Sequence, residues 1–195
     1  MSLLQETGER ITASLPDRRS ENAVAELLLA LGQDLDDPNL VETPRRVAAS
    51  YRELLRREAL TMTTFPNEEG YDELVLVRDI PFTSLCAHHL LPFRGVAHVG
   101  YLPGARLLGL SKLARVVDHF AHGLQLQERL TVEIADYLDA ELMPNGVGVV
   151  LEAEHLCMSI RGALAPTART RTSRFTGALA SHGRDHFLTA LRDRD

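Results

Sequence analysis

The sequence predicts an α+β fold: an antiparallel sheet built in the order ββααββ, with two helices on one face. Two stretches that alternate apolar and polar residues, 73–83 and 95–102, are typical of a pair of antiparallel strands. Helical stretches come next, and the chain then returns to a long β-rich run, 146–160, and to a third alternating stretch, 167–180. This order of patterns favours a layer of helices packed on a single sheet.

The chain before the sheet reads as helical. Ser20 is a plausible N-cap of a helix that stops at Gly32. Thr43 caps a second helix, with proline at its first turn, and this helix is expected to run to about residue 60. Residues 61–70 are expected to be a connector.

We therefore divide the chain into an N-terminal helical segment, 1–65, and one larger domain, 66–195. Within the larger domain, Ser111 is expected to cap the first of the two central helices, and 127–143 forms the second. A short helix over 184–192 closes the chain. In the first strand the apolar alternation falls on these residues: Leu74, Leu76, Ile80 and Phe82.

The two cysteines of the chain both lie beside histidines. Cys86 is followed by His88 and His89, and His155 precedes Cys157 by two residues. Cysteine and histidine are preferred ligands of Zn²⁺, and two cysteines with one histidine plus water form one known type of catalytic site. If 146–160 is one strand, His155 and Cys157 share a face. Spare imidazoles beside such a metal indicate acid–base chemistry at a hydrolytic centre.

Other interpretations of these residues remain open at this point. The two cysteines can form a disulfide, although nothing else in the chain indicates an oxidising compartment. They can also be inert thiols of the core. A structural zinc site would need a fourth protein ligand, which His88 or His155 can supply.

Composition narrows the class of partner. The net charge of −6 argues against nonspecific binding to nucleic acid. No apolar run approaches the roughly 20 residues of a membrane span. The first 15 residues are polar and do not resemble a secretory signal, so we expect a cytoplasmic protein without a membrane partner.

Four segments together resemble the GTP cyclohydrolase I family. They are FTSLCAHH at 82–89, GLSKLAR at 109–115, LQERL at 126–130 and EHLCMSIRG at 154–162. ETPRR at 42–46 is also similar to a helix start of this family. The resemblance implies a zinc enzyme that hydrolyses GTP at C8 to formate and 7,8-dihydroneopterin triphosphate, the first step of tetrahydrofolate and pterin biosynthesis.

The resemblance implies a role for each matching residue. Cys86, His89 and Cys157 correspond to the zinc ligands, and His88 and His155 to the two catalytic histidines. The other matching positions are Gln127 and Glu128, which imply contacts to the guanine ring, and Ser111, Lys112, Arg115 and Arg161, which imply contacts to the ribose and triphosphate. Ser111 is also expected to assist His155 in moving protons.

The sequence departs from the family pattern at Ala87, where the family usually has glutamate between the cysteine and the first histidine. Outer carboxylates orient metal ligands. The change therefore motivates two alternatives: a diverged cyclohydrolase that acts on a modified purine nucleotide, and a weakly active, zinc-stabilised oligomer that binds nucleotide. A second departure is the run of arginines at Arg169, Arg171 and Arg174.

The predicted sheet has open edges, which invite pairing with another copy of the chain. Rotational repetition closes such edges into a barrel. The family resemblance implies the tunnelling fold, a homodecamer of two stacked five-membered rings, and active sites between subunits.

Overall fold

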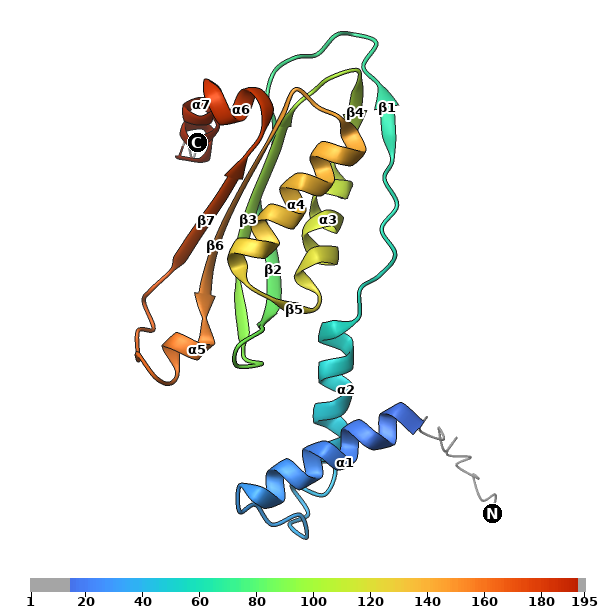
Figure 1. Ribbon diagram of the computed structural model, residues 1–195, viewed down its shortest axis with the longest axis vertical. Helices are drawn as coiled ribbons and strands as arrows, with labels where there is room; N and C mark the ends of the chain where they lie inside the picture. Colours follow the sequence, from blue (N-terminus) through green and yellow to red (C-terminus); the bar gives the residue numbers. More distant parts are fainter. Residues whose placement is uncertain (1–14, 193–195) are drawn as a thin grey trace, which may run out of the picture. The chain divides into compact units, whose positions relative to one another are not determined.

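The computed structural model describes residues 15–192 (Figure 1). Its elements, in chain order, are α1 (Leu15–Ala30), α2 (Thr43–Leu55), β1 (Thr64–Pro66), β2 (Val75–Cys86), β3 (Pro92–Leu102), β4 (Arg106–Leu108), α3 (Ser111–Ala121), β5 (Leu124–Gln125), α4 (Gln127–Leu142), β6 (Gly146–His155), α5 (Leu156–Ser159), β7 (Thr170–Phe175), α6 (Gly177–Ser181) and α7 (Arg184–Arg192).

By packing, the chain divides between Glu53 and Leu54 into two compact units. In the first unit, Arg52 of α2 donates a hydrogen bond to the Ser20 hydroxyl (2.8 Å) and pairs with Asp17 (3.2 Å) of α1. The boundary expected at residue 65, between the N-terminal helical segment and the larger domain, stays a prediction.

Two expectations for the N-terminal helices were wrong in detail. Ser20 is not an N-cap, because α1 already begins at Leu15 and the Ser20 hydroxyl donates to the Asp17 carbonyl within the helix (2.8 Å). Helix α2 ends at Leu55 and not near residue 60, because Leu60 packs against the core of the second unit. The stop at Gly32 is confirmed by its left-handed backbone, φ 78°.

The second unit confirms the predicted α+β architecture and its ββααββ order. The main sheet has the strand order β5-β2-β3-β6-β7, and its four long strands pair antiparallel. Helices α3 and α4 cover one face of it (Figure 1). Both turn an apolar stripe to the sheet, and the buried side chains of these stripes are Leu113, Val116, Val117, Ala121, Leu130, Ile134, Ala135, Leu138 and Leu142.

A β-bulge in β2 changes which residues face these helices. The register with β3 shifts between Val77 and Ile80, and Asp79 there has a left-handed backbone, φ 55°. Val77 and Ile80 therefore both join the main core although they are three residues apart. Leu76, which precedes the bulge, packs on the opposite face of the sheet. The uninterrupted alternation expected for this strand was wrong.

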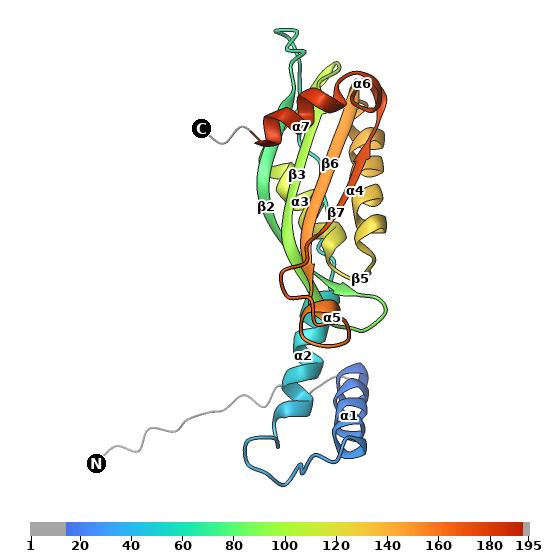
Figure 2. The ribbon, with the colours of Figure 1, turned by 90° about the vertical axis from the view of Figure 1, so that its left-hand side faces the viewer.

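The opposite face carries a smaller core under the C-terminal helices. Figure 2 shows α6 and α7 lying across one end of that face. Leu179 of α6 and Phe187 of α7 are fully buried there against Val150 of β6. The closing helix expected at 184–192 is confirmed as α7.

Short elements were the least predictable. Strands β1 and β4 form a separate two-stranded sheet, so the expected connector 61–70 contains a strand. Ser111 is the first residue of α3 and makes no capping hydrogen bond; the capping position is Leu110. The final strand is confined to β7, shorter than the 167–180 predicted. In the part of the chain that the structure describes, no helix is long and apolar enough to cross a membrane.

Candidate metal centre and active site

The tight turn between β2 and β3 holds the first two candidate ligands. Cys86 ends β2, and its carbonyl accepts hydrogen bonds from the backbone N–H of His89 (3.3 Å) and of Leu90 (2.9 Å). Leu90 has a left-handed backbone, φ 56°, which sends the chain back into β3. The turn therefore brings the side chains of Cys86 and His89 together.

The third candidate ligand comes from a different element than expected. Strand β6 ends at His155, and Cys157 lies on the four-residue helix α5. Strand alternation therefore does not relate His155 to Cys157, and the prediction that they share a strand face was wrong. Arg161 lies beyond α5 and is therefore also outside the strand.

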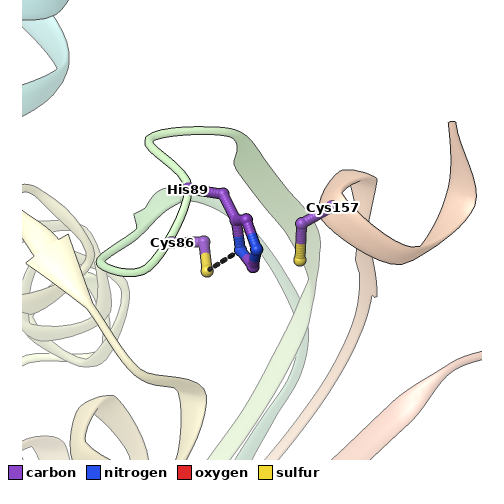
Figure 3. A group of neighbouring side chains, drawn as sticks. All are labelled: Cys86, His89 and Cys157. Carbon is purple, nitrogen blue, oxygen red and sulfur yellow. Dashed lines mark hydrogen bonds between the residues drawn. The ribbon is translucent and has the colours of Figure 1, made fainter. Parts of the chain in front are cut away.

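Cys86, His89 and Cys157 converge (Figure 3). Each offers one ligand atom, and these three atoms lie within 4.8 Å of one another. The Cys86 Sγ lies 3.8 Å from the His89 Nδ1. A tetrahedral zinc with Zn–S near 2.3 Å and Zn–N near 2.0 Å needs S···N separations of about 3.6 Å. The donor set and its spacing therefore fit a metal ion, with a fourth position left for water.

The two cysteines are free thiols, so no disulfide forms. Burial raises the pKa of the Cys157 thiol, and the neighbouring Cys86 raises it further, while the positive charge of Arg161 opposes both. Arg161 is thus close enough to act on the metal group electrostatically. Two thiols that converge with an imidazole form a donor set that Zn²⁺ prefers, and this set favours a metal site over an inert apolar core.

His88 and His155 lie beside this group without belonging to it. The ring of His88 is 6.1 Å from that of His89, nearly perpendicular to it, and the side chain is exposed. His155 is the last residue of β6, and its ring stacks on Phe93 with centroids 4.7 Å apart. Burial lowers the pKa of His155, and the negative charge of Glu128 partly opposes this.

Comparison with known proteins agrees with this geometry. A family model described as GTP cyclohydrolase I matches residues 20–192. Proteins named GTP cyclohydrolase 1 are similar over most of the chain: the one from Streptomyces coelicolor is 52% identical over 88% of both chains, and the one from Aquifex aeolicus is 47% identical over 92% of this chain and 98% of its own. The chain belongs to the GTP cyclohydrolase I family.

A further sequence relative and one solved structure are also similar to this chain. The GTP cyclohydrolase 1 of Mycolicibacterium gilvum is 53% identical over 85% of this chain and 86% of its own. Among solved structures, the apo form of the archaeosine synthase QueF-Like aligns with 54% of this chain and 94% of its own, at a TM-score of 0.45 and 18% identity. Membership of the GTP cyclohydrolase I family rests on the family model and on the sequence relatives.

The structure places some of the residues matched to this family next to His155 and others on helix α3. Gln127 and Glu128 open helix α4 next to His155. These residues come from β6 and α4, whereas the metal group comes from the end of β2, the turn that follows it and α5. Ser111, Lys112 and Arg115 lie on α3, and among the described residues no hydrogen bond or ion pair joins them to the metal group.

Phe93 is a site residue that sequence patterns did not single out. It is fully buried at the start of β3, directly opposite His155 in the strand pairing. Its ring is parallel to the imidazole, with an interplanar angle of 1°. An aromatic residue that comes shortly after a histidine cluster was the available signal, but only the β3–β6 register shows that it supports His155.

Proposed function

We propose that the protein is a zinc-dependent GTP cyclohydrolase I that converts GTP and water to formate and 7,8-dihydroneopterin triphosphate, the first step of tetrahydrofolate and pterin biosynthesis. The observation that carries the proposal is the convergence of Cys86, His89 and Cys157 beside His88 and His155. Family membership supplies the reaction. Zinc held by the three ligands supplies a Lewis acid that activates water at neutral pH.

The residues around the ligand set provide the remaining chemistry. C8 of guanine is a poor electrophile, and protonation of N7 makes it a better one. His88 is the proposed proton donor, because histidine is the side chain that most often transfers protons in active sites and this one lies beside the ligand group. His155 is the proposed proton carrier when the ribose ring opens and rearranges after formate has left, with Ser111 as its proposed assistant.

Substrate recognition divides between two ends of the site. Glu128 can accept hydrogen bonds from N1–H and the 2-amino group of guanine, a pairing that selects the base. Lys112, Arg115 and Arg161 are the proposed contacts of the triphosphate, since cationic side chains match its charge. Arg161 already acts electrostatically on the metal group, whereas Lys112 and Arg115 lie on α3.

Incubation of the zinc-loaded protein with GTP tests the proposal directly. Release of formate together with a fluorescent pterin product is the expected result. A protein that binds GTP without turnover would be the weakly active, zinc-stabilised oligomer considered above. Ala87, whose backbone N–H donates to the Gln125 carbonyl (3.0 Å), carries no carboxylate next to the ligands. A panel of purine triphosphates therefore tests whether a modified purine is preferred.

Replacement of Cys157 by serine is expected to reduce zinc content sharply, because a hydroxyl is a much poorer ligand for this ion than a thiolate. Metal analysis of the purified variant measures this. The matched control is Met158→Leu on the same short helix, an exposed position that should keep full zinc. Full occupancy in Cys157→Ser would remove Cys157 from the ligand set.

Guanosine is expected to be a far worse substrate than GTP, with kcat/KM lower by at least about 10²-fold. Interactions with a remote, non-reacting group such as the triphosphate can lower the barrier at the reacting carbon. Initial rates of formate release for the two compounds measure the difference. Equal efficiency would contradict the roles given to Lys112 and Arg115, and the Lys112→Ala variant should narrow the gap between the substrates.

The chain is expected to assemble into a ring-based oligomer, with a decamer as the proposed form. Strand β7 is an edge of the sheet, and β5 pairs with β2 only at Leu85 and Cys86, so most of the other edge is also open within the chain. Edge pairing between copies would allow residues of different subunits to share one site. Light scattering should give about ten times the chain mass of 21.6 kDa. An active, stable monomer would exclude shared sites.

A further inference from the structure

The side chain of Gln127 is fully engaged inside the protein. It is 1% exposed at the start of α4. Its Nε2 donates toward three acceptors: the Leu151 carbonyl (3.2 Å), the Thr170 carbonyl (3.0 Å) and the Thr172 hydroxyl (3.2 Å). Its Oε1 lies 2.7 Å from the Nε2 of His155. Both ends of the amide therefore have partners within the chain.

The chemistry of these partners fixes the orientation of the amide. Two of the three groups around its nitrogen are backbone carbonyl oxygens, which only accept hydrogen bonds. The reversed amide would place its oxygen against both carbonyls, so the NH₂ group must face β6 and β7. The amide oxygen then faces His155, and because that oxygen only accepts, the Nε2 of His155 must carry a proton.

Two threonine hydroxyls favour the same orientation of the Gln127 amide. The Thr131 hydroxyl donates to the Gln127 backbone carbonyl (2.7 Å), so its contact with the Thr172 hydroxyl (2.6 Å) must be donated by Thr172. Thr172 in turn accepts from the Gln127 amide. The bonds form a closed circuit, and each hydroxyl in it donates once. The donors and acceptors of these hydrogen bonds can therefore be assigned in one way only.

His155 is also held by packing, since its ring lies flat on Phe93. With Nε2 bonded to Gln127, Nδ1 is the only ring nitrogen left for a further partner. Among the described residues, Nδ1 of His155 has no hydrogen-bond partner. This leaves one nitrogen free for a ligand, on a ring whose plane and tautomer are set by buried groups.

We propose that Gln127 is a positioning residue, which holds the ring of His155 in one plane and as the Nε2–H tautomer, so that Nδ1 is the ring nitrogen available to the substrate. The inference deepens the function proposed above and rests on it for the identity of the substrate. The inference also changes the role that the family resemblance implied for Gln127. The side chain of Gln127 positions His155, and of Gln127 and Glu128 only Glu128 contacts the guanine ring through its side chain.

The first test uses ¹⁵N magnetic resonance of the histidine-labelled, zinc-loaded protein, with His155→Asn to identify the signal. The wild-type protein should show His155 as a single Nε2–H tautomer whose proton exchanges slowly with water. In Gln127→Met, which keeps the length of the side chain and removes the amide, this proton should exchange rapidly and the tautomers should average. An Nδ1–H tautomer in the wild type, or an unchanged signal in Gln127→Met, would overturn the proposal.

The second test separates kcat from KM. Gln127→Met should lower kcat by about 10-fold or more, while zinc content and the KM for GTP stay within about twofold. Thr172→Val, which removes one support of the amide and leaves Gln127 in place, should show a smaller loss in the same parameter. A raised KM with unchanged kcat would instead make Gln127 a guanine contact and would refute the positioning role.

Gln125→Met is the matched control. Gln125 is equally buried, and its amide donates to the Phe120 carbonyl (2.9 Å) and to Glu133 (2.7 Å), with no contact to His155. This variant should keep both the His155 signal and kcat. If the wild-type protein does not turn over GTP at all, the proposed function fails, whereas the magnetic resonance experiment still decides whether Gln127 positions His155.

Discussion

Replacement of His88 by alanine is expected to leave zinc in place while lowering GTP hydrolysis by about 10²-fold or more, the loss typical of a general acid. His88 is exposed and stands beside the ligand group, outside the set of three ligand atoms that converge. Its removal should therefore cost proton transfer to N7 and little else. Metal analysis and initial rates of formate release on the same preparation measure both effects.

Two other histidines make this experiment specific. His89→Ala should lose zinc, because the Nδ1 of His89 lies against Cys86 in the ligand group. His186→Ala, an exposed position on α7 outside this group, should keep both zinc and turnover. Loss of zinc from His88→Ala to the same extent as from His89→Ala would show that the roles of the two neighbours had been exchanged.

Replacement of Gly95 by alanine is expected to lower the free energy of unfolding by more than about 3 kcal/mol. Gly95 pairs with Ala153 where β3 and β6 run closest, and an added Cβ would overlap the Glu152 carbonyl oxygen and lie 2.7 Å from the Ala153 Cα. Backbone atoms cannot rotate away as a flexible side chain can. Strand β6 must shift, and its last residue, His155, would then lose its stacking on Phe93.

Urea unfolding of the variant measures the loss, and the matched control is Gly109→Ala. A Cβ at Gly109 meets its nearest neighbour, the Thr63 carbonyl oxygen, at an ordinary 3.5 Å. This control should change stability by less than about 0.5 kcal/mol. An unfolding midpoint of Gly95→Ala equal to that of the wild type would mean that the sheet accommodates the methyl group and that the close approach is unimportant.

Local sequence patterns were sufficient for the existence of the two central helices and for most of the sheet. The apolar spacing of α3 and α4 reflects burial of one helix face, and the alternation of β3 places Ala97, Val99 and Tyr101 in the main core. Both patterns depend on nearby residues only. The bulge at Asp79 was missed because its signal is a shift in register relative to β3, a property of two strands together. The turn into α5 was missed because no glycine or proline lies near His155 and Cys157 to mark the end of the strand.

The candidate site was predictable to the extent that its chemistry is carried by residue type. Cysteine and histidine are preferred zinc ligands, so the group of Cys86, His89 and Cys157 could be found from the sequence. The short helix that carries Cys157 could not be found in this way. The supports of Gln127 could not be found in this way. Two of them are backbone carbonyls, which every residue possesses, and only the packing of α4 against β6 and β7 brings them to the amide.

The wide separation of the ligands along the chain has a consequence for how the protein matures. Cys86 and His89 belong to one hairpin, whereas Cys157 joins them only when β6 has paired with β3. An ion held by all three closes a loop of about 70 residues and favours the native chain over unfolded forms. During synthesis the hairpin is complete long before its third ligand exists. Tight metal capture is therefore a late step, and it selects chains whose strands have already paired in the native register.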